Sequence, residues 1–349
     1  MRTGRASAFA IAGLAALWAW HVLWPVAAAP GDALQSAKPQ AITLSAERIA
    51  FDRDKPDKTR YGKLEWLGTL RLTSPSPQFG GYSGLALDKT GTRLLAISDT
   101  GRWLKADIIY RDGRMASLGK AMIGRLRGLD GKPLAGKIFT DSEAIAFAVD
   151  GTISGTGFIA FERVHRIAEY YVTPEGIGAA IRHLKLPRRA KTQQQNKGIE
   201  AIAILRGGRS KGALLAFSEE GLDAQGDHLG WLLGGASPGP VSLKRYGGFA
   251  ITDMAGLANG DVIILERRFR LTEGVKMRLR RVKAAELRPG ALLDGEVLLQ
   301  TDNLREIDNM EGLAIHRDAR GRDILTLISD DNFNHTFQRT LLMQFALVE

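Results

Sequence analysis

Nine carboxylates recur at corresponding places in a repeated sequence pattern. Four of them begin a short apolar segment, and five end the apolar segment that follows it. They are Glu143, Glu200, Asp253 and Glu311 at the beginnings, and Asp99, Glu162, Glu219, Glu266 and Asp330 at the ends. If folding gathers them, their repulsion must be offset by cations, arginines or protons. Carboxylate oxygens from several segments suit Ca²⁺ at flexible geometry, so all nine are candidate metal ligands.

Arginines beside these acids are candidate substrate-binding groups. Arg102, Arg163 and Arg267 would bind a phosphate or carboxylate if they face the same place as the acids. Alternatively, they fold back as ion pairs. Arg163 and Arg267 each follow a segment-ending acid, so strand alternation predicts that they point away from it. One unpaired carboxylate, Glu143 or Glu311, is the candidate general base.

The apolar segments predict the strands that position these groups. The repeats begin at residues 83, 143, 200, 253 and 311, with Ser83 in the place of the first acid. A period of this size, built on strands and glycine turns, is typical of a β-propeller. Each repeat is an antiparallel hairpin, so the beginning of its first strand and the end of its second lie at one rim. A register shift of one residue would turn an acid away from that rim.

The number of blades follows from the strands that remain. We expect six four-stranded blades, with five as the alternative. The sixth would be made by residues 42–51 and 64–72, closed by residues 341–348. A ring closed by N-terminal and C-terminal strands leaves no exposed sheet edge between them. The fold expected is therefore an all-β propeller.

Composition excludes several classes of protein. Of 349 residues, 44% are hydrophobic and 25% charged, which excludes a collagen, a disordered chain and a multi-span membrane protein. Cysteine is absent, so a thiol nucleophile, a zinc finger and a disulfide are excluded. The formal charge of +10 favours an anionic partner. The basic runs are typical of strand edges, so we expect a small anionic or ester substrate and no nucleic acid.

The N-terminus predicts export. Arg2 and Arg5 precede an apolar run over residues 8–29 that ends in small residues, the pattern of a secretory signal peptide. The alternative is an uncleaved membrane anchor, since the run approaches the length that spans a bilayer. We expect residues 1–29 to be the signal, residues 30–60 a leader partly docked on the domain, and residues 61–349 the propeller. The protein would be a periplasmic or secreted monomer, with membrane anchorage through residues 8–29 if the signal is retained.

Several motifs are similar to those of a known family. They include Phe79-Gly-Gly-Tyr-Ser-Gly-Leu85, Asp141-Ser-Glu-Ala-Ile-Ala146, Asn309-Met-Glu-Gly-Leu313 and Ile328-Ser-Asp-Asp-Asn-Phe333. From about Tyr61 to the end, the chain resembles the family called esterase-like activity of phytase. The resemblance implies an exported β-propeller that hydrolyses an ester or phosphoester with Ca²⁺ at an acidic channel mouth, and we expect a phosphomonoester. It also implies that Asn332 belongs to the site.

Two other functions stay open beside this one. A non-catalytic propeller would bind a ligand or a partner of the cell envelope at the same face, and the sequence offers no nucleophile motif that argues against it. A metal-dependent lactonase would use a divalent ion in a similar acidic mouth. Metal-dependent turnover separates both hydrolases from the binding protein, and a substrate screen separates the hydrolases from each other.

Overall fold

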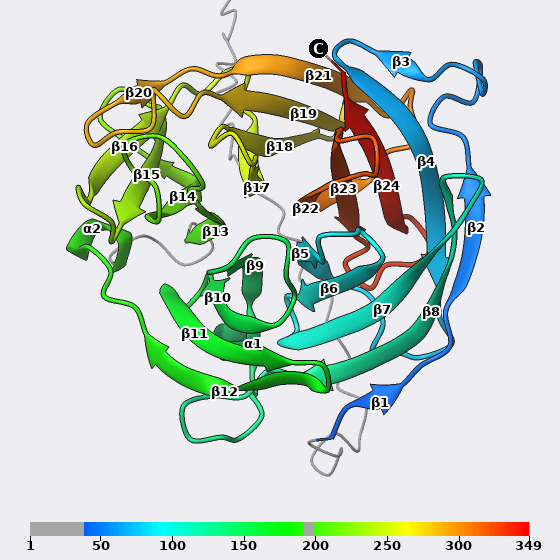
Figure 1. Cartoon of the computed structure of the whole chain (residues 1–349), viewed down its shortest axis with the longest axis horizontal. Coiled ribbons are helices and arrows are strands. Elements are labelled where there is room, and N and C mark those ends of the chain that lie inside the picture. Colours follow the sequence, from blue (N-terminus) through cyan, green and yellow to red (C-terminus); the bar gives the residue numbers. More distant parts are fainter. Residues whose placement is uncertain (1–37, 192–197, 349) are drawn as a thin grey trace, which may run out of the picture. The chain divides into compact units, whose positions relative to one another are not determined.

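A computed structural model describes residues 38–191 and 198–348. The signal peptide and anchor predicted for residues 1–29 lie outside this part of the chain. Five antiparallel sheets surround a central axis as the blades of a propeller (Figure 1). The described chain has two helices, α1 (Lys137–Thr140) and α2 (Arg188–Lys191), and neither is long enough to cross a bilayer.

The first three blades follow one another along the chain. Blade one contains β5 (Tyr82–Leu87), β6 (Arg93–Ser98), β7 (Arg102–Arg111) and β8 (Arg114–Arg125), with β1 (Gln40–Ala41) outside β8. Blade two contains β9 (Ser142–Phe147), β10 (Gly155–Phe161), β11 (Arg166–Thr173) and β12 (Gly176–His183). Blade three contains β13 (Ile199–Ile204), β14 (Leu214–Leu222), β15 (His228–Leu233) and β16 (Gly239–Leu243), with the short parallel β20 (Leu292–Leu293) at its edge.

The last two blades complete the ring. Blade four contains β17 (Ala250–Gly256), β18 (Val262–Arg270), β19 (Gly274–Val282) and β21 (Glu296–Asp302). Blade five contains β22 (Asn309–Arg317), β23 (Asp323–Asp330), β24 (Thr340–Leu347), β4 (Leu64–Thr73) and β2 (Ser45–Ile49), and β3 (Arg60–Tyr61) pairs with β4.

The ring has five blades, which corrects our preference for six. The strands expected to form a sixth blade are β2, β4 and β24, and they extend blade five instead. The reason is that β24 pairs with β23 on one side and with β4 on the other, so no new sheet begins. The prediction that N-terminal and C-terminal strands close the ring is confirmed by the same pairing.

The inner strands β5, β9, β13, β17 and β22 contact one another in this order around the axis (Figure 1). Their approach is close: a Cβ at Gly84 would lie 3.0 Å from the carbonyl oxygen of Glu143 on the next blade. Apolar side chains fill five cores, one between each pair of adjacent blades. Because all five cores depend on neighbouring blades, the ring holds the beginnings of the inner strands in fixed positions.

Candidate functional site

Each inner strand carries a β-bulge near its beginning. In every blade, two consecutive residues of the second strand pair with two residues of the inner strand that have one unpaired residue between them. The residues left unpaired, which we call the bulge ring, are Ser83, Glu143, Glu200, Thr252 and Glu311. A bulge re-aims the side chain of the extra residue. The end of the propeller where these strands begin is called the mouth.

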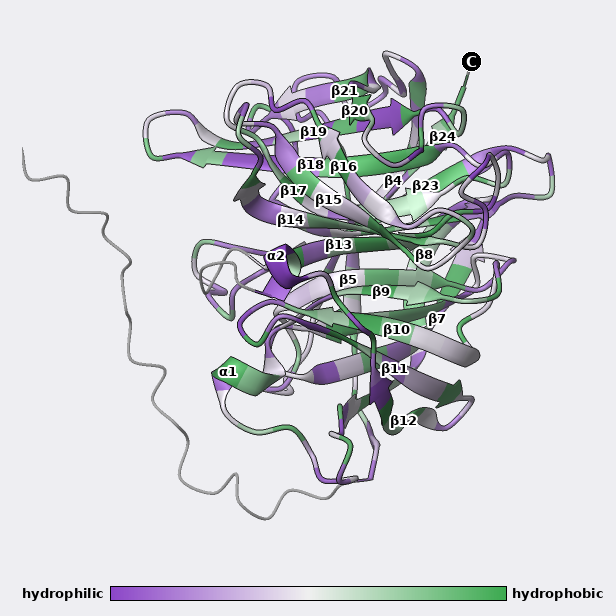
Figure 2. Ribbon diagram, turned by 90° about the vertical axis from the view of Figure 1, so that its left-hand side faces the viewer, coloured by the Kyte–Doolittle hydropathy of each residue, from purple (hydrophilic) through white to green (hydrophobic). Residues whose placement is uncertain are grey.

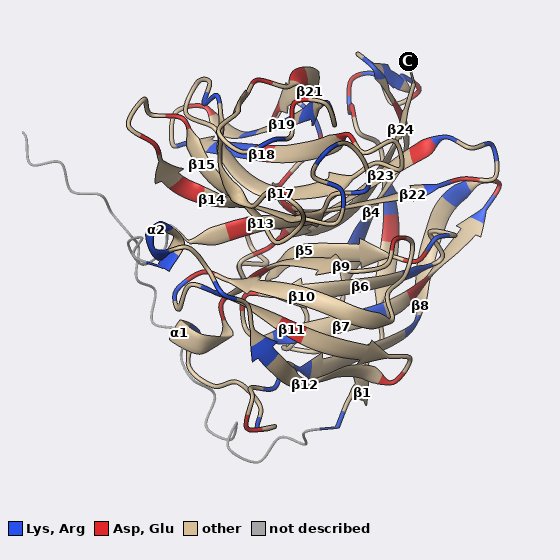
Figure 3. Cartoon of the chain, turned by 60° about the vertical axis from the view of Figure 1, so that its left-hand side comes forward, with Lys and Arg blue, Asp and Glu red and all other residues tan. Residues whose placement is uncertain are grey.

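A second ring lies where the second strands reach the mouth. Ser98, Phe161, Ser218, Glu266 and Ser329 pair with the residue next to the bulge in their blades. The residues that follow them, which we call the strand-end ring, are Asp99, Glu162, Glu219, Arg267 and Asp330. The ring therefore contains four acids and one arginine. Acidic segments at the mouth ends of β13 and β14 are visible in Figure 3.

Two of the nine predicted ligands belong to neither ring. Asp253 follows the bulge residue Thr252, and its carboxylate accepts the backbone N–H of Met254 (2.8 Å) and of Leu313 (2.7 Å). It therefore joins β17 to β22 instead of facing the other acids. The sequence pattern made Asp253 equivalent to Glu143. In the structure Thr252, one residue earlier, occupies the bulge position that corresponds to Glu143.

Glu266 is fully buried inside blade four. Its Oε2 accepts from Nε of Arg278 (2.7 Å) and of Arg280 (2.8 Å), and its Oε1 accepts from their Nη2 atoms (2.9 and 2.7 Å). Both oxygens are thus held by two guanidinium groups of β19. At this position the acid forms ion pairs with arginines, as the alternative to metal binding predicted. Glu266 has no free oxygen for a metal.

The other seven predicted ligands do come together. Ligand oxygens of Asp141, Glu143 and Glu162 lie within 4.8 Å of one another, and so do those of Glu162, Glu200 and Glu219. Glu162 is common to both groups. The charges of Asp99, Glu311 and Asp330 act on one another as well. We call the resulting eight carboxyl groups the mouth cluster: Asp99, Asp141, Glu143, Glu162, Glu200, Glu219, Glu311 and Asp330.

Sequence reasoning missed two residues of the site, Asp141 and Lys137. The Lys137 ammonium bridges blades, with Nζ 2.6 Å from Oδ2 of Asp99 and 2.5 Å from Oδ1 of Asp141. Arg163 takes the other side of Asp141, with Nε 2.6 Å from Oδ2. Asp141 stands two residues before Glu143, a spacing that places both near the bulge. Lys137 lies on α1, in a connection with no repeat to mark it.

Arg267 lies between two acids of the cluster. Its Nη2 is 3.6 Å from Oε1 of Glu219 and 3.6 Å from Oε1 of Glu311. Alternation predicted that Arg267 points away from Glu266, and it does: Glu266 enters the blade and Arg267 faces the mouth. Asn309 also donates from Nδ2 to Oε1 of Glu311 (2.6 Å).

Burial and crowding raise the pKa values of the cluster. Burial, with Asp141 and Glu219 nearby, raises the pKa of Glu162 to about 8. Burial raises the pKa of Glu311 to about 7, although Arg267 and Asn309 oppose the shift. The pKa values of Glu143, Glu200 and Asp330 are also well above the usual range, because burial and neighbouring carboxylates both favour the protonated form. Among the described residues, Lys137, Arg163 and Arg267 form ion pairs with these eight carboxyl groups. Because the acids outnumber these cations, we expect the cluster to retain protons or to take up a cation.

Two further predicted residues lie at the edge of this arrangement. Arg102 begins β7 near Tyr82, whose pKa is raised by burial and lowered in part by the arginine's charge. Asn332 has a left-handed backbone (φ 46°), and its backbone N–H donates to Oδ1 of Asp330 (2.7 Å). Its contact with the cluster is therefore made by the main chain.

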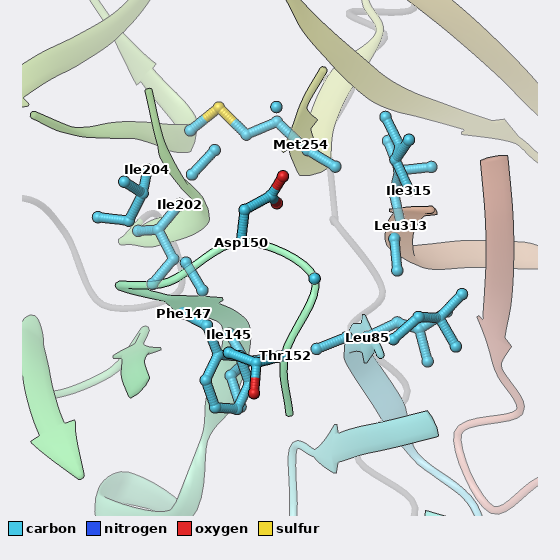
Figure 4. A pocket seen from close by; sticks show the side chains of 18 of the residues that line it. Leu85, Ile145, Phe147, Asp150, Thr152, Ile202, Ile204, Met254, Leu313 and Ile315 are labelled. Carbon is cyan, nitrogen blue, oxygen red and sulfur yellow. The ribbon is translucent and has the colours of Figure 1, made fainter. Parts of the chain in front are cut away.

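The far end of the axis has different chemistry. A cavity of about 80 Å³ is lined there by residues of all five inner strands, among them Leu85, Ile145, Ile202, Met254 and Leu313 (Figure 4). Asp150, on the loop between β9 and β10, stands over it. The carboxyl groups of the two rings are thus confined to the mouth, and the far end of the axis is lined mainly by apolar residues and also by Asp150, Thr152 and Arg206.

Comparisons with known proteins show what the chain is similar to. A family model described as "Phytase-like: Esterase-like activity of phytase" matches residues 77–333. No curated protein matches the chain. Among solved structures, the β-propeller domain of Cps50 (Swd1) from Myceliophteria thermophila covers 88% of this chain and 100% of its own, at 11% identity and a TM-score of 0.37. That likeness is too distant to add to the fold, which the five sheets define by themselves.

Proposed function

Because the chain belongs to the phytase-like family described as esterase-like activity of phytase, we propose that its acidic mouth hydrolyses an ester. We expect a phosphomonoester first, since Arg163 and Arg267 stand beside the carboxylates and suit an anionic group. The observation that carries the proposal is the convergence of eight buried or partly buried carboxyl groups from four blades at one end of the ring. We propose further that the protein acts outside the cytoplasm, as residues 1–29 predict.

The cluster has the donors of a hard cation. Its groups offer only carboxylate oxygens, without nitrogen or sulfur, and Ca²⁺ takes such ligands at flexible geometry. Glu162 would hold the ion together with Glu200 and Glu219, since this group is compact. The equally compact group with Asp141 and Glu143 would require the ion to displace Lys137 or Arg163 from Asp141. A bound ion would polarise the ester and lower the pKa of a water molecule.

The chain's own side chains supply the remaining chemistry. Arg267 and Arg163 would orient the anionic group, and their charges favour the build-up of negative charge during hydrolysis. Of the two predicted bases, Glu311 fits better, because its pKa of about 7 allows it to accept a proton near neutral pH. Glu143, whose pKa burial raises well above the usual range, suits a metal ligand that loses its proton when the ion binds.

A non-catalytic binding propeller is the second candidate. Lys137 and Arg163 already neutralise Asp141, and Lys137 also pairs with Asp99. Part of the cluster is therefore a scaffold of ion pairs that links blades one and two. In that case the mouth binds a ligand without cleaving it.

Calorimetric titration with Ca²⁺ tests the proposal. We would use residues 30–349, because every described strand and core lies within them, and compare the wild type with Glu143→Gln combined with Glu162→Gln. Asp150→Asn is the matched control, since this exposed acid lies at the far end of the axis. We expect binding in the wild type and control and its loss in the double variant. The same proteins are then screened with chromogenic phosphomonoesters, carboxylic esters and lactones. Binding without turnover of any of them would favour the second candidate, and absence of binding would overturn the metal site.

A further inference from the structure

Large apolar side chains stand exposed around the mouth. The strand directions place the connections from second to third strands, and from one blade to the next inner strand, at this end. Of fifteen exposed large apolar side chains in the described residues, nine lie on these connections or hairpins. They are Leu129, Ile138, Phe139, Val164, Tyr246, Phe269, Leu271, Leu304 and Phe337. The largely apolar α1 projects at the edge of the molecule in Figure 2.

The first group of these side chains borders the mouth at blade two. Ile138 and Phe139 lie on α1, and Val164 lies on the turn between β10 and β11. The Arg166 guanidinium joins the two segments, because it donates to the carbonyl oxygens of Phe139 (2.5 Å) and Val164 (3.2 Å). Arg166 therefore links the two backbone segments that carry these apolar side chains, near the ion pair of Arg163 with Asp141.

The second group lies at blade four. Phe269 and Leu271, which are 58% and 91% exposed, follow Arg267 of the strand-end ring in the hairpin between β18 and β19. Glu273 accepts hydrogen bonds from Arg268 (2.5 Å) and Arg270 (2.9 Å). These bonds hold the hairpin in place, so its apolar tip stays presented to solvent.

Exposed charges on the same connections are strongly basic. Five exposed basic residues there are Lys132, Lys185, Arg188, Arg189 and Lys191, and two more, Lys137 and Arg270, already pair with acids. The exposed acidic residues there are Asp130 and Glu220. The carboxylates of the mouth cluster lie inward of this basic border, where they are buried or partly buried.

We propose that the mouth face docks on an anionic lipid bilayer. The apolar side chains would enter the headgroup region, and the lysines and arginines would pair with lipid phosphates. A membrane fits better than a protein partner, because the apolar side chains stand on separate elements of different blades with cations between them. Docking of this kind is independent of the proposed hydrolysis, and it directs the mouth toward the lipid headgroups.

Vesicle flotation tests the docking. Residues 30–349 are used, so that the apolar run at residues 8–29 does not bind lipid itself, and EDTA is present so that metal binding plays no part. We expect binding to phosphatidylcholine vesicles that contain about 30% phosphatidylglycerol, weaker binding without the anionic lipid, and weaker binding in high salt. Phe269→Ser combined with Leu271→Ser should lower the partition coefficient about tenfold or more, because both side chains would leave lipid.

The matched control is Val149→Ser combined with Ile181→Ser, two exposed side chains away from the mouth connections. We expect it to bind as the wild type does, and both double variants to melt at the wild-type temperature, because all four side chains are exposed. Equal loss of binding in the control would overturn the assignment of this face. Absence of wild-type binding to anionic vesicles would overturn the proposal of membrane docking. A wild type that self-associates would identify a second copy of the chain as the partner of this face.

Discussion

Arg267 holds in blade four the position that Glu162 holds in blade two. Each residue directly follows the second-strand residue that pairs beside the bulge, Phe161 in blade two and Glu266 in blade four. The fivefold pattern of the strand-end ring thus contains one positive charge, which lies 3.6 Å from both Glu219 and Glu311. We expect this asymmetry to give the mouth a place for an anion beside the groups that would hold a cation.

Replacement of Arg267 by Gln tests whether this arginine binds an anionic substrate. The charge of Arg267 lowers the pKa of Glu311, so its loss should move the acid limb of a pH–rate profile upward from about 7. The KM for an anionic substrate should rise about tenfold as one charged contact is lost. Arg267→Lys, which keeps the charge, should restore the pH limb in large part. An unchanged pH profile in Arg267→Gln would show that Glu311 is not the titrating group.

Glu162 should make the protein less stable as the pH rises. Its pKa of about 8 in the folded chain exceeds the ordinary value of about 4.3 in an unfolded chain. Between these values the folded chain keeps a proton that the unfolded chain has released, so the free energy of unfolding falls as pH increases. In EDTA, urea denaturation should therefore give a lower stability at pH 8 than at pH 5.

Glu162→Gln isolates this effect. The amide carries no charge, so the variant should be more stable than the wild type by about 1–3 kcal/mol at pH 8 and nearly equal to it at pH 5. Added Ca²⁺ should stabilise the wild type at pH 8 and leave the variant little changed. A variant with the wild-type pH slope would mean that Glu162 is ionised in both states.

Glu266→Gln should destabilise the protein without changing the affinity of the proposed metal site. The change leaves Arg278 and Arg280 buried without their counter-charge, which costs about 3–5 kcal/mol. Chemical denaturation measures the loss, and calorimetry on the folded fraction measures Ca²⁺ affinity, which we expect to be unchanged. Full stability with lost Ca²⁺ binding would assign Glu266 to the metal site after all.

Lys137→Ala should loosen the link between blades one and two. The ammonium joins Asp99 to Asp141, and its loss should raise the pKa of Asp99 further and destabilise the fold by about 1–3 kcal/mol at pH 8 in EDTA. Differential scanning calorimetry measures the change. Lys132→Ala, an exposed lysine of the same connection, is the control and should melt as the wild type does.

The strands and their order were predictable because apolar runs of fixed spacing mark them. The direction in which a single side chain points was not predictable, since a bulge shifts the register by one residue without changing the apolar pattern around it. Asp253 therefore looked equivalent to Glu143, although Thr252 holds that position. At Glu266 a signal existed: Arg278 and Arg280 flank Leu279 on one strand, so they share a face and need an acid opposite them.

The number of blades depends on which strands pair with each other, and the sequence does not show this. Residues 42–51, 64–72 and 341–348 predict strands in either a five-bladed or a six-bladed ring. The pairing of β24 with both β23 and β4 decides for five. Likewise Lys137 lies in a connection outside the repeats, and its contacts arise only when blades one and two stand side by side.

The pairing of β4 with β24 also sets the order of events during synthesis. β4 leaves the ribosome early, and its partner emerges only after the other four blades. Until then blade five lacks its third strand, and the cores on both sides of it stay open to water. We therefore expect the chain to gain most of its cooperative stability only when β24 pairs with β4.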